Sequence, residues 1–275
     1  MARKFADEDF ICRLAEADKL FAEPECKIIK DQKKIKVGRI TVRIAGAPHS
    51  LYLKRYNSFS LARKLISPLL ESGAARALRG AAILREAEIP AADPIAAVLS
   101  LRRGAGSHSF FISEEISGGK TADAFWREEL APYRGKHGLL LRRRFLAELA
   151  ALFQAMHARG IYHNDLKDAN IVAVGAQNEH RMGLYLLDFE GVKRYRRLSR
   201  KRIVKNLMQI NRTLGRYLQR TDKLFFFKCY LGGLFSEAET KRRLIQTILN
   251  ESRRLDERKR RNPSTSTAPK RVGLD

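Results

Sequence analysis

The most informative part of the sequence is the stretch His163-Asn164-Asp165-Leu166-Lys167-Asp168-Ala169-Asn170, together with the later Leu187-Asp188-Phe189-Glu190. It supplies a carboxylate, an amide five residues later, and a second carboxylate at the end of an apolar strand. Mg²⁺ takes hard oxygen ligands, which Asn170 and Asp188 offer. An attacking hydroxyl needs a group that orients it and accepts its proton, which Asp165 offers. The pattern therefore predicts phosphoryl transfer.

The sequence on either side of this stretch supports the prediction. Leu141, Phe145, Leu149, Leu152 and Met156 recur at helical spacing, and Gly160 stands at a C-terminal cap position. The segments 170–174 and 184–189 are apolar and predict a hairpin. Asp and Asn are common in turns, so each match alone carries little weight. The ordered set of helix, loop, hairpin and Asp-Phe carries the interpretation.

The quoted residues resemble a known pattern. HNDLKDAN resembles the protein-kinase catalytic loop HRDLKxxN, and Asp-Phe-Glu stands where kinases carry Asp-Phe-Gly. The resemblance implies an α+β, two-lobed protein-kinase-like fold: a small β-rich N-lobe with one helix and a larger, mostly helical C-lobe. It also implies ATP and Mg²⁺ as cofactors. The nucleotide-binding residues that it indicates are Lys54 for the phosphates, the Glu114–Ile116 backbone for adenine, and Lys167.

The chain divides in a way that fits two lobes. Five segments have the residue pattern of strands, 27–30, 34–45, 50–56, 94–101 and 109–116, and residues 63–88 have that of a helix. Ser117-Gly118-Gly119 follows as a link, since two glycines end regular structure. We predict an N-lobe over 1–116, a C-lobe over 117–255 and a basic, disordered tail over 256–275. Residues 198–254 read as helical, with breaks near Thr221 and Gly232-Gly233.

Two features depart from the protein-kinase pattern. The glycine-rich loop is almost absent, because the corresponding turn offers only Gly38 or Gly46. The helix glutamate that should pair with Lys54 cannot be assigned. The middle of the expected helix, residues 74–84, contains no acid. The acids nearer the ends of this helix are Glu71, Glu86 and Glu88.

The charge balance predicts an acidic partner. Fifty-four Lys and Arg against 30 Asp and Glu give a net charge of +24. No apolar run approaches the length of a membrane span, and the first 20 residues do not read as a signal peptide, so we expect a cytoplasmic protein. The three cysteines show neither disulfide nor zinc-ligand spacing.

Much of this charge follows the second carboxylate directly. Residues 191–220 hold eleven Lys and Arg and no acid, and they replace the activation segment ending in Ala-Pro-Glu that forms a peptide groove in protein kinases. An apolar stripe runs through the same segment: Leu198, Ile203, Leu207, Ile210, Leu214 and Leu218. One helix face therefore packs while the other is cationic, a pattern that is often only a solvated face.

The same segment also resembles the bacterial lipopolysaccharide kinase family, which phosphorylates Kdo or heptose of the inner core. The resemblance covers about 39–231, with its strongest parts in LYLKRY, REAEIPAADPIA, HARGIYHNDLKDANI, YLLDFEGVK and KNLMQINRTL. It implies an ATP-dependent kinase with Lys54 at the phosphates, Asp165 as base, and Asn170 and Asp188 as Mg²⁺ ligands. It also implies an anionic glycolipid acceptor, met at the cytoplasmic face of the inner membrane.

Two alternatives stay open. A kinase-like phosphotransferase could act on another small molecule or a protein, although the missing Ala-Pro-Glu segment argues against a peptide. A non-enzyme could use the scaffold to bind nucleic acid or a membrane surface. We expect no nucleic acid, because no recognised motif is present. The retained set Lys54, Asp165, Asn170 and Asp188 argues against a dead kinase.

Overall fold

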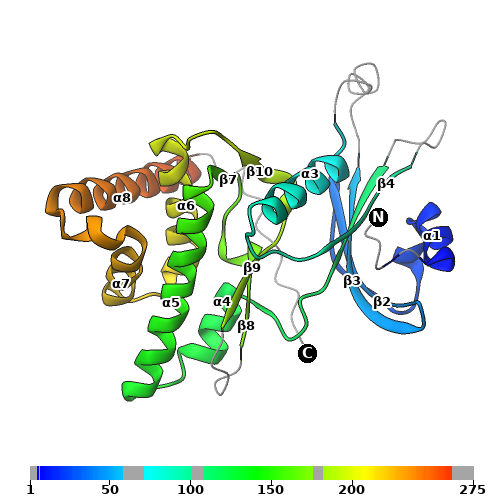
Figure 1. Cartoon of the computed structure of the whole chain (residues 1–275), viewed down its shortest axis with the longest axis horizontal. Coiled ribbons are helices and arrows are strands. Elements are labelled where there is room, and N and C mark those ends of the chain that lie inside the picture. Colours follow the sequence, from blue (N-terminus) through cyan, green and yellow to red (C-terminus); the bar gives the residue numbers. More distant parts are fainter. Residues whose placement is uncertain (1–4, 6, 58–70, 101–107, 176–181, 262–275) are drawn as a thin grey trace.

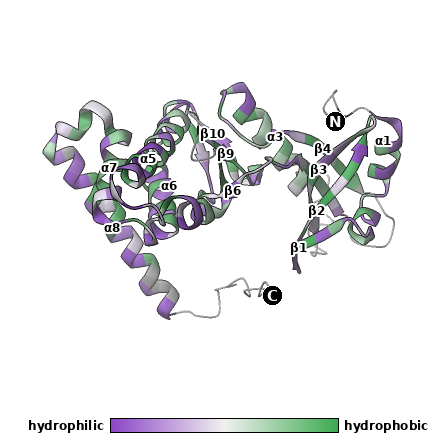
Figure 2. Cartoon of the chain, turned by 90° about the horizontal axis from the view of Figure 1, so that it is seen from below, coloured by the Kyte–Doolittle hydropathy of each residue, from purple (hydrophilic) through white to green (hydrophobic). Residues whose placement is uncertain are grey.

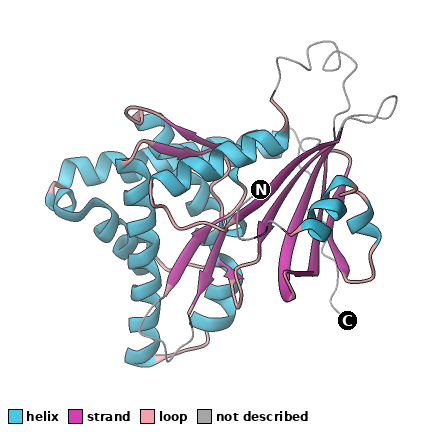
Figure 3. Ribbon diagram, turned by 45° about the vertical axis from the view of Figure 1, so that its right-hand side comes forward, coloured by secondary structure: helices cyan, strands magenta, loops and turns pink. Residues whose placement is uncertain are grey.

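A five-stranded antiparallel sheet forms the first lobe of the computed structural model, which describes residues 5, 7–57, 71–100, 108–175 and 182–261 (Figures 1 and 3). Its order is β1-β2-β3-β5-β4. The strands are β1 (Cys26–Gln32), β2 (Ile35–Ile44), β3 (Ala47–Asn57), β4 (Pro94–Ser100) and β5 (His108–Glu114). Alternating residues of β2 and β3 are buried, so one face carries the core.

Two helical segments that the sequence interpretation did not include cover this core. α1 (Glu8–Ala15) and the 3₁₀ turn η2 (Lys19–Ala22) bury Phe10, Leu14 and Leu20 against the sheet. Asp7 caps α1, because its carboxylate accepts a hydrogen bond of 2.9 Å from the amide of Phe10. The small lobe therefore contains one α-helix more than the predicted α3.

The expected helix of the small lobe is α3 (Gly73–Glu86). The hydroxyl of Ser72 caps it, at 3.0 Å from the amide of Ala75. Its buried face consists mainly of glycine and alanine, which lets the helix backbone come close to its neighbours. The predicted start of this helix, over 63–70, lies outside the described residues.

The second lobe is built around the long helix α5 (Gly135–Ala158), whose predicted apolar stripe lies at the core. Phe145, Leu149 and Met156 are at most 1% exposed. Gly160 ends the helix with φ +72°, a conformation that glycine adopts without strain. The remaining early elements are β6 (Lys120–Thr121), α4 (Ala122–Phe125), the π-helical turn η3 (Trp126–Leu130) and β7 (Ile161–His163).

The predicted hairpin is present as β8 (Ile171–Val174) and β9 (Gly183–Leu186). Beside it, β10 (Val192–Arg194) pairs with β7. The hairpin also meets the first lobe, because Leu186 accepts a hydrogen bond from the amide of Ala92 and donates one to the carbonyl of Pro90. The link at 117–119 lies between β5 and β6, with a turn from the amide of Gly119 to the carbonyl of Ile116.

Helices complete the second lobe on the side away from the large sheet (Figure 1). They are α6 (Arg200–Arg212), η6 (Leu214–Arg216), α7 (Arg220–Leu231), η7 (Gly232–Ser236) and α8 (Ala238–Arg261). The break expected near Thr221 is confirmed: α6 ends at Arg212 and α7 begins at Arg220, where Gln219 and Asp222 cap its N-terminus. The Gly232-Gly233 break is confirmed.

The end of α8 also differs from the predicted tail. The helix continues past residue 255 to Arg261, because its Arg, Lys and Glu residues are good helix formers. Figure 2 shows hydrophilic residues over its outer turns. The rest of the predicted tail, 262–275, lies outside the described residues. Within the described ranges, no helix is both long and apolar enough to cross a membrane.

Candidate active site

His163 fixes the loop that carries Asp165. Its ring is fully buried, its Nδ1 accepts a hydrogen bond of 3.2 Å from the amide of Asp165, and its Nε2 lies 3.1 Å from the carbonyl of Leu187. An acceptor at Nδ1 and a donor at Nε2 assign the neutral tautomer. Burial lowers the pKa of His163 and so favours the same neutral form. The ring therefore ties the loop to the strand that leads to Asp188.

Asp165 lies at the open side of this loop. Its side chain is 49% exposed, and Lys167 Nζ lies 2.6 Å from its Oδ2. The Nδ2 of Asn170, on the 3₁₀ turn η4 (Asp168–Asn170), donates to the carbonyl of Asp165 at 2.7 Å and lies 3.4 Å from Oδ2. The structure therefore brings Asp165, Lys167 and Asn170 together, with the carboxylate of Asp165 accessible to an acceptor.

Asp188 lies beside this group, directly before the 3₁₀ turn η5 (Phe189–Gly191). The amide of Leu187 donates to the carbonyl of Asn170 at 2.9 Å, which places Asn170 and Asp188 on adjacent segments. Lys54 Nζ reaches across from β3 to lie 2.6 Å from Asp188 Oδ1. Burial opposes ionisation of Asp188, but the charge and hydrogen bond of Lys54 outweigh it and hold its pKa below the usual value.

Two of the three acids near the ends of α3 pair with arginines and not with Lys54. Glu71 forms an ion pair with Arg79, and Glu86 Oε2 lies 3.6 Å from Arg194. Glu88 follows the helix with φ +51°. Lys54 instead lies over the ring of Tyr56, 5.0 Å from its centroid, as well as beside Asp188.

The β1–β2 turn, which corresponds to the glycine-rich loop of protein kinases, contains neither Gly38 nor Gly46. Gly38 lies inside β2, where an added Cβ would stand 2.7 Å from Cys26 Sγ, and Gly46 lies in the turn between β2 and β3. The β1–β2 turn contains Lys33 and Lys34 instead. A tight strand-to-strand turn needs only two residues, so no glycine-rich segment is required to close it.

Glu114 and Ile116 lie where β5 leaves the small lobe. The amide of Glu114 donates to the carbonyl of Asp93 at 2.9 Å, and the carbonyl of Ile116 accepts from Gly119 at 3.0 Å. The carboxylate of Glu114 lies 3.3 Å from His49 Nδ1. Adenine binding at Glu114 and Ile116 stays a prediction.

Three side chains of α6 and its end support the loop, and the sequence interpretation did not assign them. Asn206 Nδ2 donates to the carbonyl of His163 at 2.5 Å, and Gln209 Nε2 donates to that of Asn164 at 2.6 Å. The hydroxyl of Thr213 accepts from the amide of Asp168 at 3.2 Å. Their spacing of three and four residues was the available signal, since it places polar groups on one helix face.

The basic segment 191–220 lies next to this loop, with its predicted apolar stripe turned inward. Leu198, Leu207, Ile210 and Leu214 are buried. Lys205 Nζ donates to Asn164 Oδ1 at 2.9 Å, one residue from Asp165. Most of the other cations are exposed: Lys193, Arg194, Arg196, Arg197, Arg200, Lys201, Arg216 and Arg220.

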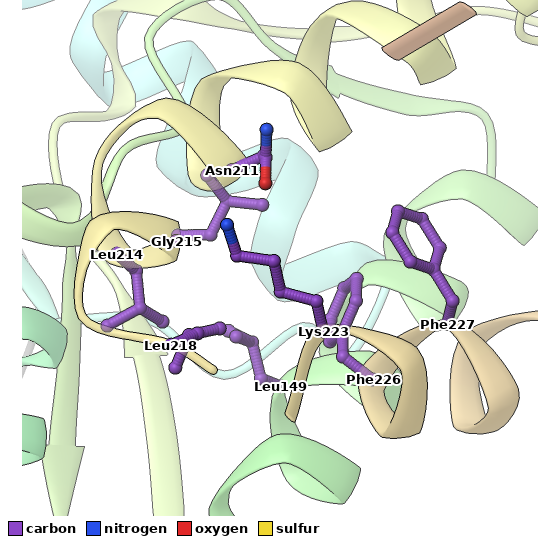
Figure 4. Close-up of a pocket in the computed structure, with 9 residues that line it drawn as sticks. Leu149, Asn211, Leu214, Gly215, Leu218, Lys223, Phe226 and Phe227 are labelled. Atoms are coloured by element: carbon purple, nitrogen blue, oxygen red, sulfur yellow. The ribbon is translucent and has the colours of Figure 1, made fainter. Parts of the chain in front are cut away.

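A separate apolar pocket lies between α5, α6 and α7. Leu149, Leu214, Leu218 and Phe226 line it, and the Lys223 side chain extends along it toward Asn211 (Figure 4). The pocket contains none of the four residues on which the phosphoryl-transfer prediction rests.

Most of the chain matches a known protein family. The model of the lipopolysaccharide kinase (Kdo/WaaP) family matches residues 23–230. The chain belongs to this family. It is a kinase that transfers phosphate to a sugar hydroxyl of lipopolysaccharide, and a kinase family implies use of ATP.

A solved structure shares the fold of this kinase. The structure titled "WaaP in complex with acyl carrier protein" matches with a TM-score of 0.63 and 18% identity over 90% of this chain and 97% of that one. The comparison supports the two-lobed α+β fold predicted from the sequence. No curated protein sequence matches.

The donor set fits a magnesium ion shared with phosphates. No group of three or more His, Cys, Asp or Glu gathers within the described ranges. Mg²⁺ at nucleotide sites typically takes one or two carboxylates together with phosphate and water oxygens, and Asp188 and Asn170 supply one carboxylate and one amide. Since Nδ2 of Asn170 points to Asp165, its Oδ1 is the atom that would meet the cation.

Proposed function

We propose that this kinase transfers the γ-phosphate of ATP to a hydroxyl of Kdo or heptose in the lipopolysaccharide inner core, with Asp165 as the catalytic base. The observation that carries the proposal is the position of Asp165: half exposed, yet anchored through its backbone to buried His163 and to Asn170. A carboxylate held in this way can orient an incoming hydroxyl and accept its proton.

The other site residues take complementary roles. Mg²⁺, held by Asn170 and Asp188, would neutralise charge on the phosphates. Lys54 would move partly away from Asp188 to contact the α- and β-phosphates, and Lys167, which lies beside Asp165, would pair with the transferred phosphate. Glu114 and Ile116 would meet the adenine through their backbone.

The acceptor is an anionic glycolipid, and we propose that the exposed cations of 191–220 hold it. Lys205 supports this role because it lies one residue from Asp165. The same cations would bind anionic headgroups at the cytoplasmic face of the inner membrane, each contributing about 1 kcal/mol near the surface. An acyl carrier protein is a candidate protein partner, since the structural neighbour was solved with one. Co-purification of that carrier with the tagged kinase tests this partner.

Mass spectrometry of core oligosaccharide tests the acceptor. Cells that lack the kinase should yield a core lighter by one phosphate, and fragmentation should place the missing group on Kdo or heptose. Complementation with the wild-type chain should restore the mass, whereas Asp165→Asn should not. An unchanged core mass in the deletion strain would contradict the proposed acceptor.

A further inference from the structure

Helix α3 lies directly on the loop that carries Asp188. An added Cβ at Gly80 would stand 2.0 Å from the carbonyl oxygen of Phe189, and one at Gly73 would stand 2.4 Å from the ring of Tyr56. Glycines at these positions therefore let the helix backbone approach both the Asp-Phe-Glu loop and the strand that carries Lys54. The helix has no room for an inward-facing acid at these two positions.

Arg76, one turn before Gly80, links α3 to the Asp-Phe-Glu loop by charge. Its guanidinium forms an ion pair with the carboxylate of Glu190 and donates to the carbonyl of Glu71 at 2.7 Å. The two side chains are 34% and 27% exposed, so solvent screens the pair only in part. Arginine suits such a position because its planar guanidinium offers several donors in a fixed arrangement.

The loop beside this ion pair has an unfavourable backbone conformation at Asp188, which the surrounding contacts must stabilise. Asp188 has φ +58° and ψ +65°, the left-handed region that non-glycine residues rarely adopt. Phe189 is 2% exposed and packs edge-on against Phe111, with 5.6 Å between ring centroids. Phe111 stands opposite Lys54 in the sheet. Phe189 and Glu190 therefore anchor the loop immediately after Asp188, one by packing and one by charge.

From these contacts we infer that Arg76 is a positioning residue for phosphoryl transfer: through Glu190 it holds the Asp188 loop against α3. The inference rests on the proposed role of Asp188. In protein kinases a lysine–glutamate pair couples this helix to the site. Here the helix supplies the cation and the loop supplies the acid, which gives a physical reason for Glu190 in place of glycine after Asp-Phe. It also agrees with an α3 interior that lacks acids.

Steady-state kinetics with matched variants tests the pair. Arg76→Gln and Glu190→Gln should each lower kcat roughly 10- to 100-fold, because small displacements of reacting groups cost rates of that order, while KM for core oligosaccharide changes less than about threefold. Arg79→Gln is the control: it removes an ion pair from the same helix, with Glu71, away from the loop. Its kcat should stay within about twofold of wild type.

Charge exchange separates positioning from general loss of structure. Arg76→Glu and Glu190→Arg should each be impaired, and the double variant should recover at least about tenfold in kcat over either single variant. Recovery in the double variant cannot come from a merely destabilised chain. Failure to recover, or full activity of Arg76→Gln beside an inactive Asp188→Asn, would overturn the inference.

Hydrogen exchange provides a readout independent of turnover. The peptide over 187–192 should exchange faster in Arg76→Gln than in Arg79→Gln, with the peptide over 145–156 unchanged. Equal exchange in the two variants would contradict the inference. Should Asp188→Asn keep full activity, the proposed site roles would fail, and the exchange comparison would still decide whether Arg76 holds the loop.

Discussion

At the scale of single residues, His157 should make stability depend on pH. Burial lowers its pKa to about 4, and its hydrogen bond to Asn206 opposes this only in part. Below pH 6.5 the unfolded chain therefore binds a proton that the folded chain does not. The free energy of unfolding should fall between about pH 6.5 and 4, by up to about 3 kcal/mol from this group.

Urea unfolding of wild type and His157→Gln at pH 7.5 and 4.5 measures this contribution. Glutamine keeps a hydrogen-bonding side chain toward Tyr230 and Asn206 without titrating. The variant should lose less stability than wild type over the same pH change. Equal losses in the two proteins would show that His157 does not stay neutral in the folded chain.

A second prediction at the residue scale concerns the effect of Gly80→Ala on stability. Alanine normally stabilises a helix interior by up to about 1 kcal/mol relative to glycine, but here the methyl group would meet the Phe189 carbonyl. We expect Gly80→Ala to lower the unfolding free energy by about 1–3 kcal/mol and to reduce activity. Leu78→Ala, on the exposed side of α3, serves as control in thermal melts. A Gly80→Ala chain more stable than wild type would contradict the close approach.

At the scale of elements, α6 both supports the catalytic loop and carries cations of the proposed acceptor site. One face presents Asn206 and Gln209 to the catalytic loop, and its exposed residues include Arg200 and Lys201. Charge and apolar periodicity predicted the exposed cations and the buried stripe. The polar contacts to the loop could not be predicted, because they depend on how α6 is placed against β7, which no local pattern specifies.

Asn206→Asp tests the support that α6 gives to the loop. An ionised carboxylate cannot donate to the His163 carbonyl, and residue 206 is fully buried. We expect a loss of about 1–3 kcal/mol in unfolding free energy and a lower kcat. Asn211→Asp, also on α6 but outside the contacts to the loop, should change both quantities less. Wild-type activity in Asn206→Asp would argue against a positioning role for α6.

At the scale of the whole molecule, local sequence patterns predicted the α+β, two-lobed fold but not the side-chain contacts between its segments. The sequence pattern indicated four site residues, because phosphoryl transfer needs particular residue types at characteristic positions along the chain: Lys54, Asp165, Asn170 and Asp188. The pairing of Lys54 with Asp188 joins residues 134 positions apart. The Arg76–Glu190 contact joins residues 114 apart, and the two pairs depend on how β3 and α3 lie against the segment that follows β9. α1 was missed although Phe10 and Leu14 stand one helical turn apart, because a helix of only eight residues depends on packing against the sheet for its stability.

The net charge of +24 predicts binding to anionic membranes. The kinase should sediment with phosphatidylglycerol-containing vesicles at low salt, bind less as salt rises, and bind weakly to phosphatidylcholine alone. Replacing Arg196, Arg197, Arg200 and Lys201 by glutamine should weaken this binding. The matched control removes the same charge from α8, with glutamine at Arg242, Arg243, Arg253 and Arg254. Equal binding to both vesicle types would contradict a charge-driven membrane contact.

Transfer of labelled γ-phosphate from ATP to purified inner-core oligosaccharide, measured for wild type and Asp165→Asn, tests Asp165 as the catalytic base. The neutral amide keeps the size of the side chain but cannot act as the base. We predict a kcat lower by roughly 100-fold or more, with the melting temperature close to wild type. Transfer by Asp165→Asn at the wild-type rate would contradict the assignment of Asp165 as the catalytic base.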